Sequence, residues 1–253
     1  MMSIDNKFIS LLPAGVVEQA GDSVGGRLLR EYGAVFAAGS GVEPPDRLIF
    51  RDEAEVSEFQ RRVSIGIVQF GDITIELQSR AAAALKEAAD AAREAGLSIS
   101  PRSSDSGRRS YADTVSLWHS RVEPALDHWV EQHKLSPAEA ANIRALSPFE
   151  QVPVVLSLED KGVFFAKDLA KTILYSVAPP GASQHLSMLA FDVAEFNNPA
   201  VRKLLADHRW YQTVVSDLPH FTYLGFPETC LPTRGLKKVV FDEREFWLPD
   251  ANE

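Results

Sequence analysis

The chain lacks the cysteines that a disulfide framework or a cysteine-rich zinc site would need. Cys230 is its single cysteine, so it cannot form a disulfide within the chain, and any metal site must draw on histidines and carboxylates. An excess of basic residues is also missing, because the formal net charge is -9. Proteins that bind nucleic acids usually present a clustered basic face, so we expect no nucleic-acid partner.

Long hydrophobic runs are missing as well. No apolar stretch reaches the roughly 18 residues that a transmembrane helix requires. The apolar stretch from Phe8 to Val17 is interrupted by Pro13, and Glu18, Gln19 and Ala20 after it make a poor cleavage site, which disfavours a secretory signal. The sequence as given therefore predicts a cytoplasmic location.

Motifs of several other enzyme classes are absent. The chain contains no G-x-S-x-G elbow, no G-x-x-x-x-G-K-[ST] phosphate loop and no H-E-x-x-H zinc motif. The glycines between Gly21 and Gly26 follow no predicted strand, and we interpret them as part of a flexible lead-in. Residues 1 to about 45 as a whole mix apolar pieces with Gly and Pro and predict irregular structure.

Hydrophobic periodicity predicts helices and strands in mixed order along the rest of the chain. Helices are predicted at 53–62 (capped by Asp52), 76–95, 111–133 and 199–208, with another starting at Ser136. Strands are predicted at 48–50, 63–70, 73–75, 97–100, 210–215 and 220–224, and within 183–193. Because these elements do not alternate strictly, the sequence predicts an α+β fold.

Four of the six histidines show no pattern that indicates a shared site. His119, His128 and His133 are separated by nine and five residues within one predicted helix, which does not place them on one face. His208 ends a short predicted helix, where the helix dipole favours a partly cationic side chain. We interpret these four as surface or structural residues.

His185 and Asp192 flank an apolar stretch, where a polar side chain is costly without a partner. Their separation puts them roughly 10 Å apart along a helix and on opposite faces of a regular strand. Binding of one metal ion by both therefore requires a bend, or His185 in the loop before the strand, which Pro179, Pro180 and Gly181 support. By itself the pair favours a buried histidine and a capping aspartate.

His220 has a carboxylate, Asp217, three residues before it at the start of a predicted strand. Zinc accepts histidine nitrogen and carboxylate oxygen, and a catalytic zinc site keeps one position for water. Two histidines and one aspartate would leave that position open. In such a site Asp217 could accept a proton from the water as a general base.

Three segments, in this order, carry a family resemblance: Ser106-Gly107-Arg108-Arg109-Ser110-Tyr111, then Ser183, His185, Ala190 and Asp192, then His220, Phe221 and Tyr223. They are similar to the S-G-Y-R-S, S-x-H-x-x-G-x-A-x-D and E-x-W-H-F-x-Y segments of the zinc D-alanyl-D-alanine carboxypeptidase and dipeptidase family. That family includes the vancomycin-resistance peptidases and shares its fold with the hedgehog signalling domain. The resemblance covers about residues 76 to 226.

The resemblance implies a small antiparallel sheet flanked by helices, with residues 1–75 as an N-terminal extension of unknown role and 76–253 as the peptidase-like domain. It implies one Zn²⁺ ion bound by His185, Asp192 and His220. Arg109 would stabilise the developing oxyanion and Asp217 would be the general base, so both are expected catalytic residues. Ser183 and Tyr223 are the expected substrate-binding residues.

Four positions depart from the family pattern. Met188 stands at the family's glycine, Pro219 at its tryptophan and Thr114 at a glutamine that the family often uses on substrate. Met188 would make the turn between the ligands bulkier and narrow the pocket. Asp217 replaces the family's glutamate with a side chain shorter by one methylene, and a misplacement of about 1 Å can cost roughly a hundredfold in rate.

The sequence thus predicts a zinc metallopeptidase that hydrolyses D-Ala-containing, cell-wall-type peptides derived from peptidoglycan. The alternative is a zinc-binding module of the same fold that senses or binds and hydrolyses little or nothing, which the departures at Met188, Pro219 and Asp217 favour. The family resemblance leaves a periplasmic or extracellular location open. Exopeptidase versus endopeptidase action and the oligomeric state are left open too.

Overall fold

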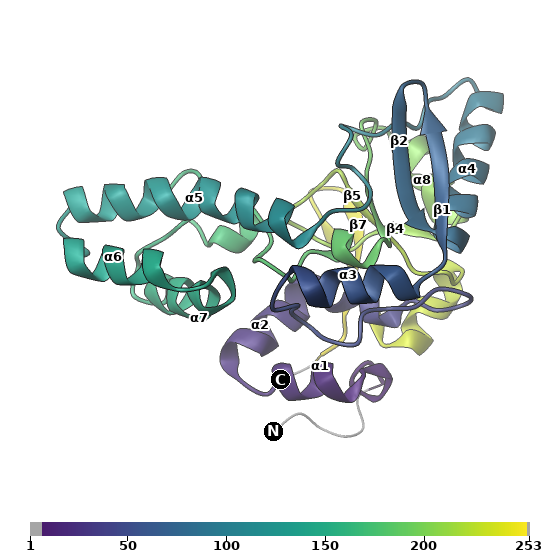
Figure 1. Cartoon of the computed structure of the whole chain (residues 1–253). Helices are drawn as coiled ribbons and strands as arrows, with labels where there is room; N and C mark the ends of the chain where they lie inside the picture. The colour runs from purple at the N-terminus through teal and green to yellow at the C-terminus, as the bar shows by residue number, and fades with distance from the viewer. Residues whose placement is uncertain (1–6, 252–253) are drawn as a thin grey trace. The chain divides into compact units, whose positions relative to one another are not determined.

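The computed structural model describes residues 7–251 (Figure 1). This part of the chain forms two compact units. The first unit comprises the chain up to Leu48, Ser57–Arg109 and the chain from Gln184 onward, and the second comprises Ile49–Val56 and Ser110–Ser183. A domain boundary after residue 75 stays a prediction. None of the helices within residues 7–251 has the length and apolar character needed to cross a membrane.

The N-terminal segment of the first unit is largely helical, so its predicted irregular structure is wrong. It contains η1 (Ile9–Leu11), α1 (Ala14–Gln19), α2 (Ser23–Tyr32) and η2 (Gly33–Ala37). The Asp22 side chain caps α2 by accepting a hydrogen bond of 2.7 Å from the Gly25 nitrogen. A Cβ at Gly25 would lie 1.8 Å from the Gln19 carbonyl oxygen, so this glycine serves a close backbone approach rather than flexibility.

A two-stranded hairpin follows α3 (Glu53–Arg62), in which β1 (Ile65–Phe70) pairs antiparallel with β2 (Ile73–Gln78). The predicted Asp52 cap is confirmed by a 3.0 Å hydrogen bond from the Glu55 nitrogen. Helix α4 (Ser79–Glu94) lies along the hairpin in Figure 1. It begins three residues later than predicted because Glu76 to Gln78 pair with β1 instead.

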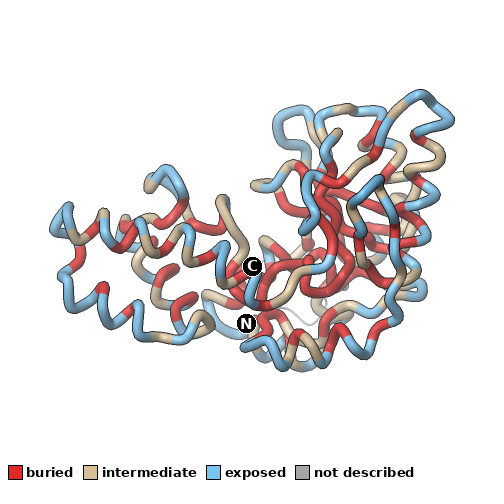
Figure 2. The backbone as a smooth tube through the Cα atoms, turned by 45° about the horizontal axis from the view of Figure 1, so that its top comes forward, coloured by how far each residue is buried: buried red, intermediate tan, exposed pale blue. Residues whose placement is uncertain are grey.

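The central sheet of the first unit has the order β3-β5-β4, and both pairings are antiparallel. Its strands are β3 (Ala190–Asp192), β4 (Trp210–Gln212) and β5 (His220–Tyr223), and α8 (Pro199–Asp207) lies between β3 and β4 in the chain. Every residue of the three strands is buried (Figure 2). The predicted α+β class with a small antiparallel sheet is therefore confirmed.

The two faces of this sheet differ in chemistry because side chains alternate along each strand. Directly paired residues share a face, so Asp192, paired with His220, and Ala190, paired with Thr222, lie on one side. The other side is aromatic, and the ring of Trp210 lies 6.2 Å from that of Phe191 and 5.4 Å from that of Tyr223, measured between centroids. One face thus supplies packing and the other supplies polar groups.

The C-terminal part of the first unit contains η5 (Glu228–Arg234) and a hairpin of β6 (Leu236–Phe241) and β7 (Arg244–Pro249). Two predicted strands, 48–50 and 97–100, are wrong. The Leu48 nitrogen bonds the Gln19 side chain at 2.7 Å, and the Ser100 nitrogen bonds the Glu195 carboxylate at 2.8 Å. Side chains thus satisfy backbone groups that a sheet would otherwise pair.

The second unit is helical and contains α5 (Tyr111–Glu131), α6 (Pro137–Ala145), α7 (Pro148–Glu159) and η3 (Ile173–Tyr175). Capping boxes begin α5, α6 and α7, each pairing a serine with an acidic residue three positions on: Ser110 with Asp113, Ser136 with Glu139, and Ser147 with Glu150. Helix α5 buries Trp118, Val122, Leu126 and Trp129.

Candidate metal centre

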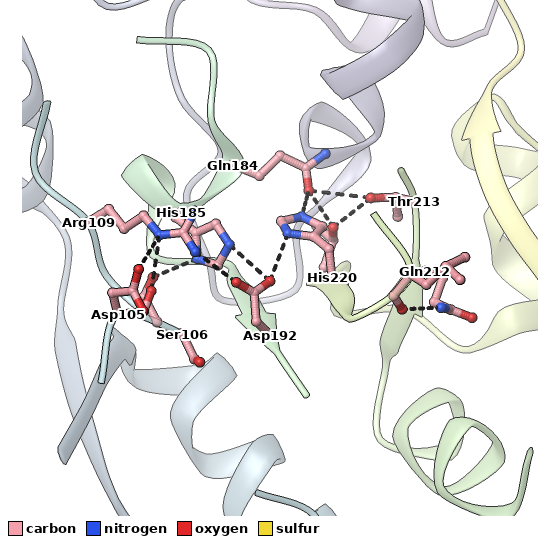
Figure 3. Close-up of polar contacts among 12 residues, drawn as sticks. Asp105, Ser106, Arg109, Gln184, His185, Asp192, Gln212, Thr213 and His220 are labelled. Carbon is pink, nitrogen blue, oxygen red and sulfur yellow. Dashed lines mark hydrogen bonds and ion pairs between the residues drawn. The ribbon is translucent and has the colours of Figure 1, made fainter. Parts of the chain in front are cut away.

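Three buried residues of the first unit come together on the polar face of the central sheet. His185 lies on η4 (Gln184–Ser187), Asp192 ends β3 and His220 begins β5 (Figure 3). Oδ1 of Asp192 lies 3.2 Å from Nε2 of His185 and 3.4 Å from Nδ1 of His220. One potential ligand atom from each residue lies within 4.8 Å of the others. The structure therefore brings together the three residues predicted to bind a metal.

A bend between His185 and Asp192 makes this arrangement possible. The chain leaves the single 3-10 turn of η4 at Met188, whose nitrogen donates a 3.1 Å hydrogen bond to the His185 carbonyl. Met188 has a φ of 59°, a left-handed conformation that glycine adopts without steric cost. Its side chain is fully buried, and the narrowing of a pocket by its bulk stays a prediction.

A backbone carbonyl from the Ser106-Gly107 segment orients His185. Nδ1 of His185 lies 2.7 Å from the Gly107 carbonyl oxygen, which can only accept a hydrogen bond, so the hydrogen of the neutral ring resides on Nδ1. The Nε2 lone pair is then directed at Asp192. The same segment holds Asp192, because the Asp192 nitrogen donates to the Ser106 carbonyl at 3.0 Å.

The Gln184 side chain orients His220 in the same manner. Its Oε1 lies 2.9 Å from Nε2 of His220, and its Nε2 donates a 2.8 Å hydrogen bond to the Tyr32 carbonyl. A carbonyl cannot donate, so the contact with Tyr32 fixes which end of the amide is the nitrogen. The ring hydrogen of His220 therefore resides on Nε2, and the Nδ1 lone pair faces Asp192.

The centre thus consists of electron-pair donors that face one another. His185 Nε2 and Asp192 Oδ1 are buried and have no hydrogen-bond partner within residues 7–251, an arrangement that costs free energy unless a cation joins them. Zinc ligands at about 2.05 Å in tetrahedral geometry lie about 3.3 Å apart, which matches the separations of 3.2 and 3.4 Å. The donor set fits a zinc ion.

The protonation states also suit a metal site. Burial lowers the pKa of His185, and the Arg109 charge acts in the same direction against the opposing effect of Asp192. The Arg109 guanidinium, 2.7 Å from Asp192 Oδ2, favours the ionised form of the Asp192 carboxyl. A neutral imidazole and an ionised carboxylate are the forms that coordinate metal ions.

Arg109 holds the second oxygen of Asp192. Its Nη2 lies 2.7 Å from Asp192 Oδ2, and its Nε donates a 3.0 Å hydrogen bond to the Asp105 carbonyl. The guanidinium is largely buried, with 14% of the side chain exposed. Charge-assisted contacts of this kind fix a carboxylate firmly, so Arg109 leaves Oδ1 as the atom directed at the two histidines.

Three other predicted site residues, Asp217, Tyr223 and Ser183, lie outside the cluster of His185, Asp192 and His220. Asp217 is exposed in the turn before β5, and its carbonyl accepts a 3.1 Å hydrogen bond from the His220 nitrogen. Tyr223 lies on the opposite face of β5 from His220 and packs against Trp210. Ser183 ends the second unit and is nearly buried. Their catalytic and substrate-binding roles stay predictions.

Sequence reasoning missed Gln184 and the supporting role of the Ser106 and Gly107 carbonyls. Gln184 stands between Ser183 and His185, at a variable position of the family pattern, so no motif marked it. The only signal was its polar side chain next to an apolar run, where a hydrogen-bond partner is expected.

Comparison with known proteins agrees with this arrangement. The family model described as VanY: D-alanyl-D-alanine carboxypeptidase matches residues 74–236, which is more than half of the chain. The match contains all three residues of the cluster as well as Arg109 and Asp217. Searches of curated proteins and of solved structures found no match. On the strength of the family match, the chain belongs to the VanY family of D-alanyl-D-alanine carboxypeptidases.

Proposed function

We propose that the protein is a zinc-dependent metallopeptidase that hydrolyses D-Ala-containing peptides derived from peptidoglycan. The observation that carries the proposal is the convergence of three potential metal ligands, His185 Nε2, Asp192 Oδ1 and His220 Nδ1. Their lone pairs face one another with no hydrogen atom between them. A family match to D-alanyl-D-alanine carboxypeptidases supplies the substrate class.

His185, Asp192 and His220 would hold one zinc ion. When bound, zinc supplies a Lewis acid that acidifies water and polarises a carbonyl. Asp217, exposed in the turn that leads to His220, accepts the proton of the attacking water and delivers it to the departing amine. The carbonyl carbon gains the water oxygen while its bond to nitrogen breaks, which releases D-alanine and a shortened peptide.

Arg109 would lie next to the reacting carbonyl, because its guanidinium contacts the proposed ligand Asp192 at 2.7 Å. A fixed cation next to the scissile carbonyl stabilises the negative charge that develops on its oxygen. Ser183 and Tyr223 are proposed to contact the substrate peptide.

The alternative is a metal-binding module of the same fold that hydrolyses little or nothing. The departures from the family pattern at Met188, Pro219 and Asp217 favour it, because a shorter general base must come closer to the proton that it accepts. In this alternative the three metal ligands keep their role and only the catalytic role of Asp217 is lost.

A digest of muropeptides that end in D-Ala-D-Ala, read by mass spectrometry, tests the proposal. Zinc-loaded protein is expected to release D-alanine, and protein treated with a chelator is expected to release none until zinc is restored. Substrates ending in L-Ala-L-Ala serve as the control and should stay intact. A zinc-loaded protein that cleaves none of these peptides would support the non-hydrolytic alternative.

A further inference from the structure

The Gln184 side chain connects the metal centre with the N-terminal helix α2. It is buried, and its two amide atoms face opposite partners. Oε1 accepts a hydrogen bond from His220 Nε2 at 2.9 Å (Figure 3). Nε2 of Gln184 donates one to the Tyr32 carbonyl at 2.8 Å. Tyr32 is the last residue of α2. One side chain thus contacts both a proposed metal ligand and a helix from the start of the chain.

Two threonines complete the surroundings of the amide oxygen. The hydroxyls of Thr222 on β5 and of Thr213 just after β4 both contact Gln184 Oε1, the latter at 3.3 Å. Their own oxygens lie 2.6 Å apart. The oxygen of Gln184 is therefore surrounded by donors, and only the nitrogen end is available to the Tyr32 carbonyl. Rotation of the amide by 180° would place its oxygen against the Tyr32 carbonyl and its nitrogen against the N–H of His220 Nε2.

The segment from the end of α2 to just after η2 has further contacts near the start and the end of β5. The Glu31 carboxylate accepts a 3.2 Å hydrogen bond from Ser216, in the turn that carries Asp217. The Gly39 nitrogen, two residues after η2, donates a 3.2 Å hydrogen bond to the Leu224 carbonyl. The residues around Tyr32 therefore dock where the sheet presents His220.

We propose that Gln184 is a positioning residue that couples metal binding to the docking of α2. It fixes the ring of His220 with Nδ1 toward the metal, and it does so from an orientation that α2 sets through the Tyr32 carbonyl. Because coupling between two events is reciprocal, metal binding stabilises the α2 contact, and loss of that contact weakens metal binding. The inference rests on the proposed metal site and does not require catalysis.

Two substitutions of Gln184 separate the two contacts. Gln184→Glu keeps an acceptor for His220, Thr213 and Thr222 but places a carboxylate oxygen against the Tyr32 carbonyl. Gln184→Ala removes both contacts. Outer partners of metal-binding histidines typically contribute about 10–100-fold to metal affinity. We expect Gln184→Ala to lose zinc affinity by about that factor. Gln184→Glu should lose less, because its carboxylate still serves as a partner of His220, but it should still bind zinc more weakly than the wild type, because the contact with Tyr32 is lost.

The control is Gln151→Ala, which removes another buried glutamine. Gln151 lies in the second unit and bonds Trp118 Nε1 at 3.1 Å. Its substitution should lower stability without a change in zinc affinity. Zinc affinity is measured on the full chain by competition with a chromophoric chelator, so the reading does not depend on peptide hydrolysis.

Hydrogen exchange of residues 23–37, read by mass spectrometry, tests the coupling itself. Zinc should slow amide exchange there in the wild type, whereas Gln184→Glu should bind zinc without this protection. Zinc binding by the wild type with no change in exchange at α2 would overturn the coupling but leave the metal site intact. Wild-type affinity in Gln184→Ala would overturn the positioning role. A wild type that binds no zinc would overturn the proposed site.

Discussion

Asp192 and His220 stand directly opposite each other in the antiparallel pairing of β3 and β5, with Asp192 Oδ1 3.4 Å from His220 Nδ1. Their backbones are fixed by sheet hydrogen bonds, so two of the three proposed ligands are positioned by rigid elements. His185 reaches them from a 3-10 turn, and the Gly107 carbonyl orients its imidazole ring. Sites built on strands hold ligand geometry more closely than sites on loops.

Substitution of Arg109 tests the support of Asp192. Arg109→Ala removes the 2.7 Å contact with Oδ2 and frees the carboxylate to rotate, so zinc affinity should fall about 10–100-fold. Arg109→Lys should recover part of the loss, because an ammonium cannot bond the Asp105 carbonyl and Asp192 in the same planar geometry. Arg93→Ala, at an exposed ion pair with Asp90, is the control and should bind zinc normally. Equal zinc affinity in all three variants would contradict this role.

Gly107→Ala tests the carbonyl that orients His185. A Cβ at this position would lie 2.7 Å from Ile75 Cγ2 and 3.0 Å from the Glu76 carbonyl oxygen, so the segment must shift away from β2. Overpacking of this kind typically costs about 1–3 kcal/mol, and we expect a lower free energy of unfolding together with weaker zinc binding.

Gly26→Ala is the matched control for Gly107→Ala. The nearest atoms to its Cβ would lie at 3.7 and 3.8 Å, and alanine favours a helix interior by up to about 1 kcal/mol over glycine. Urea unfolding measures the free energy of unfolding, and competition with a chelator measures zinc affinity. The account of Gly107 fails if its substitution leaves zinc affinity at the level of Gly26→Ala.

The lowered pKa of His185 predicts how stability depends on pH without metal. Below about pH 6.5 the unfolded chain takes up a proton on this histidine, while the folded protein takes one up only at a lower pH. The unfolded state then binds more protons, so the free energy of unfolding falls as the pH is lowered from about 7. The slope from this group is at most about 1.4 kcal/mol per pH unit.

Urea unfolding of the metal-free protein between pH 7 and pH 5 measures that slope. His185→Gln should reduce it. A slope in His185→Gln as steep as in the wild type would show that other groups dominate.

Substitution of Asp217 distinguishes a peptidase from a silent module. Asp217→Asn removes the proposed base but none of the ligands, so zinc content should stay at one ion per chain while the release of D-alanine falls by about 10²–10⁴-fold. Asp217→Glu lengthens the side chain by one methylene. A loss of rate in this variant would identify aspartate as the working base, and a gain would indicate a degenerate site. Release of D-alanine by Asp217→Asn at the wild-type rate would exclude a catalytic role for this residue.

Much of the fold was predictable where local signals agreed. The helix Glu53–Arg62 was predicted with its cap, and strands were predicted at 210–215 and 220–224, where β4 and β5 lie. Helix α2 was not predictable, because Gly25 and Gly26 suggest a flexible segment, whereas Gly25 in fact permits a close approach to the Gln19 carbonyl. That contact depends on tertiary structure, which a local pattern does not contain.

The candidate site was likewise predictable only in part. Motif order identified His185, Asp192 and His220, and the spacing of the first two required either a bend between them or His185 in the loop before the strand. Gln184 was not identifiable, because its role depends on Tyr32, which lies far from it in the sequence. The contact of Arg109 with Asp192, rather than with solvent or substrate alone, likewise depends on how the Ser106–Arg109 segment lies against β3.

Zinc content after loading and exhaustive dialysis tests the central claim most directly. The wild type and the control His208→Ala, whose Nδ1 bonds the Leu204 carbonyl at 2.8 Å, are expected to keep about one zinc ion per chain, the number that one His-Asp-His donor set holds. His185→Ala, Asp192→Ala and His220→Ala are each expected to retain almost none. A wild type without zinc, or a full complement of zinc in all three variants, would contradict the account.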